Sequence, residues 1–224
     1  IAVQLARLTG QRVLFFTALG RDAIGQRSEQ RLRQLGVEPV VAWRDKPSRR
    51  GISLMDPSGD RAITVIGERL MPTAEDDLGW ERLADCDGVF VSATDCDGLR
   101  HARQARILSA TPRLGISVLQ QASVPLDALI GSALDPGEHV PENSFNPAPA
   151  VQITTEGEAG GVLIPGGRFD AVPLPGPMVE SYGCGDSFAA GVTAGLSAGW
   201  TTHQAVMLGA RCGAACATRF GPYD

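Results

Sequence analysis

Residues 179–196 read VESYGCGDSFAAGVTAGL, a glycine turn followed by a run of small and apolar residues. Gly183 and Gly185 permit positive φ angles or a close approach of the backbone to a ligand. Asp186 or Ser187 stands where the N-cap of a helix is expected. The first amides of such a helix have no partners within it, and the helix dipole is positive there. The stretch therefore predicts a turn and a helix whose beginning binds an anion.

Asp186 is unusual in this setting, because a carboxylate beside an anion site repels the anion unless it has a chemical task. One such task is to accept the proton of an attacking hydroxyl as a phosphoryl group arrives. The alternative is that Asp186 only caps the helix, while Gly191 and Gly195 serve close helix packing. The residues of this stretch alone leave both interpretations open.

Composition narrows the class of protein. The 224 residues are 43% hydrophobic and 20% charged, which is ordinary for a globular protein with a full core. The net charge is −5 with both signs dispersed, so we expect no nucleic-acid partner, and no apolar run is long enough to cross a membrane. The five cysteines lack Cys-x-x-Cys spacing, which favours reduced thiols and a cytoplasmic location. The chain begins at Ile1 within a helical pattern, and no signal peptide is visible.

Helical and strand-like segments alternate along the chain, which is typical of a parallel α/β sheet. Residues 1–8 predict a helix that ends at Gly10, and residues 13–19 predict a buried strand. Further helices are expected within residues 20–36, 75–86, 98–110, 187–197 and 202–220, and further strands at residues 37–43, 88–93, 114–119 and 151–155.

Two glycine-containing turns lie between strand-like runs. Asp56-Pro57-Ser58-Gly59-Asp60-Arg61 joins residues 51–55 to residues 62–66 and predicts a hairpin. Residues 155–160 form a Thr-x-Gly-x-x-Gly turn after the strand at 151–155. Its glycines would let a nucleotide approach closely, although an ordinary hairpin connection is equally consistent with so common a pattern.

The motif at residues 183–188, followed by Ala190-Gly191 and Gly195-Leu196, resembles the C-terminal signature of the ribokinase-like (PfkB) carbohydrate kinases. The Gly-x-Asp-x-x-Gly pattern at residues 20–25 and the turn at residues 155–160 resemble the family in the same order. The chain departs from the family at Glu180-Ser181, where Asp-Thr is usual. The resemblance implies a three-layer α/β/α sandwich with a mainly parallel sheet. It also implies one domain over residues 1–224, a small β lid near residues 37–66, and an opening strand that this chain lacks.

The resemblance further implies an ATP-dependent kinase that transfers the γ-phosphoryl group to a hydroxyl of a sugar or sugar derivative. Asp186 would be the catalytic base, and backbone amides would stabilise the transferring phosphoryl group. The implied amides are those of Gly183, Cys184 and Gly185, and the residues implied for ATP contact are Thr155, Glu156, Gly157 and Gly160.

The resemblance also implies Mg²⁺, leaves a monovalent cation open, and suggests a homodimer through the lid. The family's Asn-x-x-Glu metal motif is not met, and its nearest counterparts are Asp135 and Glu138. A solvated acidic loop is the simpler interpretation of those two carboxylates.

Other functions remain open from the sequence. The departures from the family motifs motivate a non-catalytic nucleotide- or sugar-binding regulatory protein, since fold does not secure function. A nucleoside kinase is a further alternative. A nicotinamide-dependent dehydrogenase is disfavoured, because no early Gly-x-Gly-x-x-Gly precedes a helix. Nothing in the sequence identifies the acceptor.

Overall fold

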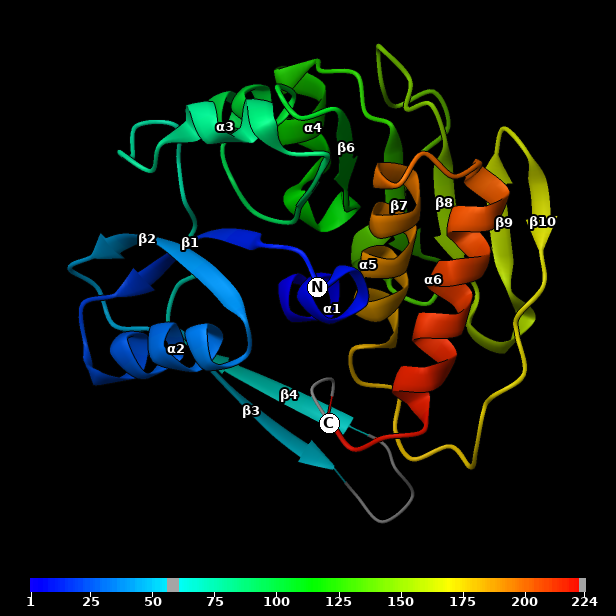
Figure 1. Ribbon diagram of the computed structural model, residues 1–224, viewed down its shortest axis with the longest axis horizontal. Helices are drawn as coiled ribbons and strands as arrows, with labels where there is room; N and C mark the ends of the chain where they lie inside the picture. The colour runs from blue at the N-terminus through cyan, green and yellow to red at the C-terminus, as the bar shows by residue number, and fades with distance from the viewer. Residues whose placement is uncertain (56–60, 222–224) are drawn as a thin grey trace.

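A six-stranded sheet lies at the centre of the computed structural model, which describes residues 1–55 and 61–221 (Figure 1). Its strand order is β10-β9-β8-β7-β6-β5. Strands β5 to β8 are parallel, whereas β9 and β10 each pair antiparallel with the preceding strand. The bounds are β5 Gly88–Val91, β6 Ile107–Ala110, β7 Ala128–Ser132, β8 Gln152–Thr155, β9 Gly161–Ile164 and β10 Gly167–Phe169.

Helices cover both faces of this sheet. On one face, α3 (Cys96–Ala102) and α4 (Ile116–Ala122) contribute to a buried core, and on the other α5 (Cys184–Ser197) and α6 (Thr202–Ala217) contribute to a second core. The side chains of β7 alternate between the two, because Leu129 lies in the first core while Ala128 and Ile130 lie in the second. The predicted α/β/α arrangement with a mainly parallel sheet is confirmed.

A parallel pair, β1 (Val13–Gly20) and β2 (Val37–Arg44), forms a separate two-stranded sheet. Helix α1 (Ala2–Thr9) precedes it, and α2 (Ala23–Gln34) connects its two strands. Within residues 37–66, near which lid segments are expected, β2 pairs with β1 rather than with the hairpin that follows it. The organisation of the chain as one domain stays a prediction.

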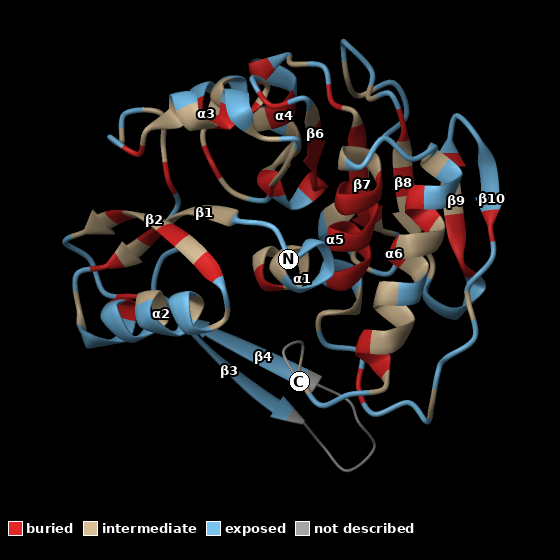
Figure 2. Ribbon diagram, viewed as in Figure 1, coloured by how far each residue is buried: buried red, intermediate tan, exposed pale blue. Residues whose placement is uncertain are grey.

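The expected hairpin is present as an antiparallel pair, β3 (Arg50–Met55) and β4 (Arg61–Ile66). Figure 1 shows it projecting away from the sheets, and Figure 2 shows its surface exposed. Residues 56–60 of the predicted turn lie outside the described residues. We refer to β3 and β4 as the lid hairpin.

Two sequence predictions between residues 98 and 122 are wrong. The helix expected at 98–110 ends at Ala102, and a four-residue buried strand, β6, follows it. The strand expected at 114–119 is the helix α4, which starts after Gly115 with φ 109°. Its buried residues, Leu119 and Ala122, have the three-residue spacing of a helix, whereas the strand was expected from the apolar residues within 114–119.

The helix expected at 75–86 is reduced to a 3₁₀ segment, η1, over Trp80–Asp85. Gly79, at φ 67°, precedes it and is incompatible with a continuous α-helix. Asp76 instead pairs with Arg44, with shortest N–O distance 2.5 Å, and accepts the amide of Thr73. No helix in the described part of the chain is both long and apolar enough to span a membrane.

Close packing of α5 on α6 fixes where the beginning of α5 lies. A Cβ atom at Gly191 would lie 2.7 Å from the Cα of Gly209, so glycine is needed there. At its other end, the carbonyl of Ser197 accepts a 2.5 Å hydrogen bond from Arg106, just before β6, and a Cβ at Gly88 would meet the Ser197 side chain. The end of α5 thus lies at the amino ends of β5 and β6, and its beginning lies toward their carboxyl ends.

Candidate active site

The candidate site lies at the carboxyl ends of the parallel strands, where α/β sheets commonly bind ligands. The beginning of α5 lies at this end of the sheet, and so do two turns that follow strands. The first is the segment after β7, which contains Asp135 and Glu138, and the second joins β8 to β9. The structure therefore brings the sequence-predicted site residues to one edge of the molecule.

Gly183 is the N-cap of α5, with φ 84°, so the expected cap at Asp186 or Ser187 is wrong. The helix starts three residues earlier than predicted, because the left-handed Gly183 already turns the chain into it. Asp186 lies in the first turn and makes no capping hydrogen bond. Its position there is favourable electrostatically, since the beginning of a helix attracts negative charge.

The amides at the beginning of α5 differ in their partners. The Cys184 amide donates to the Ser181 carbonyl at 3.3 Å, and the Ser187 amide donates to the Gly183 carbonyl at 2.8 Å. The amides of Gly185 and Asp186 donate to no acceptor within residues 1–55 and 61–221. A Cβ added at Gly185 would meet no atom within 4 Å, so open space lies beside these two amides. Free amides at the beginning of a helix are suited to binding an anion.

The Asp186 side chain is exposed and makes no hydrogen bond or salt bridge with any described residue. Its neighbour Ser187 is buried, and its hydroxyl accepts a hydrogen bond of 3.3 Å from Gln4 in α1. Ser187 thus fixes the helix while Asp186 presents a carboxylate to solvent. An exposed carboxylate beside unpaired amides can accept a proton from a group bound there.

Cys184 contributes its backbone rather than its thiol. Burial, followed by the neighbouring Cys216, raises the pKa of the Cys184 thiol to about 12. The thiol is therefore neutral near pH 7 and a poor nucleophile. All five cysteines are free thiols.

The turn between β8 and β9 contains the 3₁₀ segment η4 (Gly157–Ala159). The Glu156 amide donates to the Gly160 carbonyl at 2.7 Å, and the Glu156 carboxylate pairs with Arg168 at 2.5 Å. Glycine is required at Gly160, where φ is 81° and a Cβ would lie 2.1 Å from the Phe169 carbonyl oxygen. The close approach of the Phe169 backbone, in β10, therefore explains why residue 160 is glycine, and a bound nucleotide is not needed to explain it.

Thr155 and Gly157 complete this turn. The Thr155 hydroxyl donates to the Gly131 carbonyl at 3.3 Å, and Gly157 adopts φ 64°. The turn is a preformed backbone element at the carboxyl end of β8.

Asp135 and Glu138 do not form a ready metal site. Asp135 accepts the amide of Gly137 and pairs with Arg113. Glu138 accepts the Ser132 amide at 2.8 Å and the Arg113 Nε at 2.5 Å. In the described residues, no group of three or more His, Cys, Asp or Glu side chains is placed to hold a metal ion. The arginine supplies the positive charge that a metal would supply.

Sequence reasoning missed the partner of Asp22. Its carboxylate accepts hydrogen bonds of 2.8 Å from three donors, the amides of Gly25 and Ser48 and the Ser48 hydroxyl. The pattern predicted the cap at Gly25 but carried no signal for Ser48, which lies 26 residues away. The hydrogen bonds hold the pKa of Asp22 at about 2, with the Ser48 amide as the largest cause.

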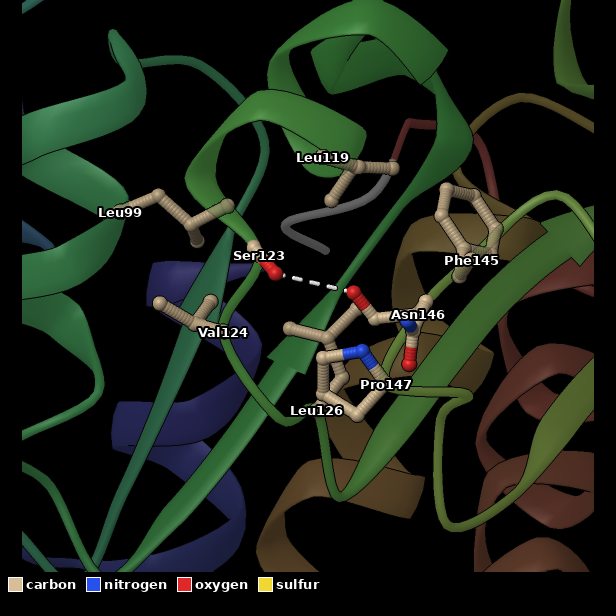
Figure 3. A pocket seen from close by; sticks show the side chains of 8 residues that line it. All are labelled: Leu99, Leu119, Ser123, Val124, Leu126, Phe145, Asn146 and Pro147. Carbon is tan, nitrogen blue, oxygen red and sulfur yellow. Dashed lines mark hydrogen bonds between the residues drawn. The ribbon is translucent and has the colours of Figure 1, made fainter.

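A small pocket lies at the opposite end of the sheet (Figure 3). The Ser123 hydroxyl donates to the Asn146 carbonyl at 2.9 Å across it. Its volume of about 10 Å³ holds at most a water molecule. Because its residues precede β7 and β8, it is separate from the candidate site. It is lined by Leu99, Leu119, Ser123, Val124, Leu126, Phe145, Asn146 and Pro147.

Comparison with known proteins finds a family match over the C-terminal part of the chain. Residues 126–224 match the model of the pfkB family carbohydrate kinases, and this region contains the beginning of α5 and the turn after β8. The family match and the fold agree with the resemblance to the PfkB-type carbohydrate kinases that the motifs predicted.

Individual relatives agree with this class. The crystal structure of ribokinase from Thermotoga maritima has a TM-score of 0.77 at 18% identity, covering 99% of this chain and 80% of that one. Adenosine kinase from Sinorhizobium meliloti has a TM-score of 0.76 at 17% identity, covering 100% and 77%. At these identities the likeness concerns the fold. A 63-residue stretch is 41% identical to fructoselysine 6-kinase of Escherichia coli (strain K12), over 28% of this chain and only 24% of that relative.

Proposed function

We propose that the protein is an ATP-dependent kinase that transfers the γ-phosphoryl group to a hydroxyl of a sugar or sugar derivative. The observation that carries the proposal is the pairing of free amides at Gly185 and Asp186 with an unpaired Asp186 carboxylate. This arrangement lies within the region that matches the carbohydrate kinase family. An anion site alone would suit many ligands, but the adjacent free carboxylate supplies the base that phosphoryl transfer to an alcohol needs.

In the proposed reaction, the oxygen of the acceptor hydroxyl attacks the γ-phosphorus of ATP, the bond from that phosphorus to the β–γ bridging oxygen breaks, and ADP leaves. Asp186 accepts the proton of the acceptor hydroxyl. The amides of Gly185 and Asp186 and the positive end of α5 stabilise the charge on the transferring phosphoryl group. Gly183 contributes by shaping the turn. Cys184 contributes less than expected, because its amide already donates to Ser181.

ATP is proposed to bind near the turn formed by Thr155, Glu156, Gly157 and Gly160. Mg²⁺ is proposed to arrive with ATP, held by phosphate oxygens and water. Asp135 and Glu138 are not proposed as direct ligands, since Arg113 engages both. A monovalent cation stays an expectation of the resemblance.

The acceptor is the least constrained part of the proposal. The relatives are described as a ribokinase, an adenosine kinase and a fructoselysine 6-kinase, so a first panel contains ribose, fructose, fructoselysine and adenosine. Turnover of adenosine alone would favour the alternative of a nucleoside kinase. Binding of ATP or sugar without turnover would favour the alternative of a non-catalytic regulatory protein.

We predict that Asp186→Asn retains the fold and ATP binding but lowers kcat at least about 10²-fold, because the general base is lost. Phosphorylated product measured across the acceptor panel gives kcat, and calorimetry gives ATP binding. Asp77→Asn is the matched control, since Asp77 is exposed and lies in the segment before η1. Near-normal turnover by Asp186→Asn would contradict the assigned role.

We also propose a homodimer through the lid hairpin and a cytoplasmic location. Large apolar side chains on one face of the hairpin are exposed, including Leu54 at 64% and Ile52 at 46%, and such a surface favours a covering partner. The free thiols support a reducing compartment.

A further inference from the structure

Three arginine side chains gather beside the base of the lid hairpin. Arg69, just after β4, donates hydrogen bonds to the carbonyls of Ser92 at 2.9 Å and Arg113 at 3.3 Å. Burial, followed by the positive charges of Arg49 and Arg113, lowers the pKa of Arg69 from its ordinary value. Like charges are therefore held close together at this point.

The positive charge of this cluster is only partly compensated. Arg113 is paired with Asp135 and Glu138. Arg69 donates to carbonyls alone, and Arg49 forms no salt bridge within the part of the chain that the structure describes. The one carboxylate next to Arg69 in sequence is Glu68, and it pairs with Lys46. Two guanidinium groups thus lack a carboxylate partner.

The cluster lies at the same end of the molecule as the candidate active site. Ser92 follows β5 and Arg113 follows β6, so Arg69 lies at the carboxyl ends of both strands. A Cβ at Gly67 would lie 3.6 Å from the Cα of Arg49, which places Arg49 at the base of the lid hairpin.

The cluster is also separated from the proposed nucleotide turn after β8. Three strand spacings separate β5 from β8, roughly 15 Å. An occupant of the space between the lid hairpin and β5 would therefore be the acceptor rather than the adenosine part of ATP.

We propose that the phosphoryl acceptor carries an anionic group, a carboxylate or a phosphate, that Arg49 and Arg69 bind. This inference rests on the proposed kinase function. The planar guanidinium forms paired hydrogen bonds with either kind of anion, and an anion between two uncompensated arginines relieves their repulsion. The acceptor class is then sugar acids or sugar phosphates rather than neutral sugars.

Matched acceptors test this proposal. Initial rates are measured for fructose against fructose 1-phosphate and for glucose against gluconate, with saturating MgATP. We expect kcat/KM to be at least about tenfold higher for one anionic member than for its neutral partner, the scale of one charge-assisted contact. The member that responds distinguishes phosphate from carboxylate.

Variants then assign the effect to the cluster. Arg49→Gln is expected to remove the advantage of the anionic acceptor, while rates with the neutral acceptor stay within about twofold. Arg50→Gln is the control, because neighbouring residues of an extended chain point to opposite sides and Arg50 is not among the charges that act on Arg69. Arg69→Gln also removes the contacts with Ser92 and Arg113, so it is secondary.

Several results would overturn the proposal while leaving the kinase function intact. One is equal turnover of neutral and anionic acceptors. Another is an Arg49→Gln variant that keeps the preference for the anionic acceptor. A third is an Arg49→Gln variant in which the KM for MgATP rises while the KM for the anionic acceptor does not. Absence of turnover with every acceptor would instead count against the kinase function. In that case, calorimetric titration of the wild-type protein with fructose 1-phosphate and gluconate tests the anion-binding inference independently of turnover. If neither anion binds, the inference is overturned.

Discussion

Asp22 shows how one carboxylate joins distant parts of this chain. It holds the amides of Gly25 and Ser48, and so fixes the turn after β1 to the segment that leads into the lid hairpin. The glycines around it are required by this contact. A Cβ at Gly20 would lie 2.4 Å from the Ser48 nitrogen, and one at Gly25 would lie 2.1 Å from the Gly20 carbonyl oxygen.

We predict that Asp22→Asn lowers the Tm at pH 7, because an amide nitrogen would face the donors of Ser48. The effect should depend on pH. The pKa of Asp22 is about 2 in the folded protein and about 3.9 when unfolded, so the carboxylate stabilises the fold fully above pH 4 and loses this effect as the pH falls toward 2. Thermal unfolding of both proteins from pH 7 to pH 2.5 should show the difference shrinking over that range. A difference independent of pH would contradict this origin.

At the residue scale, the sequence predicted which side chains and amides belong to the candidate site. It did not predict which hydrogen bonds and ion pairs those groups form. The glycine turn and the small residues after it predicted a helix that begins near Asp186, but not that the helix begins already at Cys184, which places Asp186 in its first turn. The engagement of the Cys184 amide by Ser181 was not predicted either, because it depends on the φ of Gly183. The pairing of Asp135 and Glu138 with Arg113 depends on two loops that only the sheet brings together.

The surface of the lid hairpin is left uncovered by the rest of the described chain. Figure 2 shows its surface exposed, although Ile52 and Leu54 are large apolar residues. Register pairs Ile52 with Thr64 and Leu54 with Ala62, so these side chains share one face of the hairpin. That face is the natural candidate for contact with a second copy.

We predict that the protein is a dimer and that Leu54→Lys shifts it toward the monomer, because a charge would be buried against the partner. Sedimentation velocity across a concentration series measures the shift. Ser53→Lys, on the opposite face of the same strand, is the control and should leave the dimer intact. A wild-type monomer at all concentrations, or equal effects of both substitutions, would contradict the proposed interface.

At the scale of helices and strands, the long helices α5 and α6 were predicted correctly, whereas the short elements β6 and α4 were not. The small residues of α5 and α6 are typical of two tightly packed helices. The structure confirms this packing, because a Cβ atom at Gly191 would lie only 2.7 Å from the Cα of Gly209. The strand β6 was predicted as part of a helix because it is only four residues long, Ile-Leu-Ser-Ala, and begins five residues after α3 ends. Burial on both faces of a sheet removes the alternation that identifies a strand.

For the whole molecule, the order of helices and strands was sufficient to predict three layers, since parallel strands joined by helices leave few topologies. The separation of β1 and β2 from the six-stranded sheet was not predicted. That separation depends on which strand edges meet in space, and hydrophobic patterns carry no information on this.

The direction of α5 relative to the six-stranded sheet determines where the candidate site lies in the molecule. Helix α5 runs along the sheet so that its end meets the amino ends of β5 and β6, and its beginning, with Asp186, lies toward the lid hairpin. The proposed nucleotide turn, the free amides at the beginning of α5, the Asp186 carboxylate and the arginine cluster thus lie at one edge. A substrate covered by the lid hairpin would be shielded from water, which otherwise competes for the phosphoryl group.

The central claim is phosphoryl transfer from ATP to a hydroxyl, and the most direct test follows the phosphoryl group itself. The protein is incubated with Mg²⁺, γ-labelled ATP and the neutral and anionic acceptors, and mass spectrometry identifies the labelled product. The account predicts one phosphorylated acceptor formed together with ADP, and loss of that product in Asp186→Asn. ATP binding without a phosphorylated product from any acceptor would contradict it.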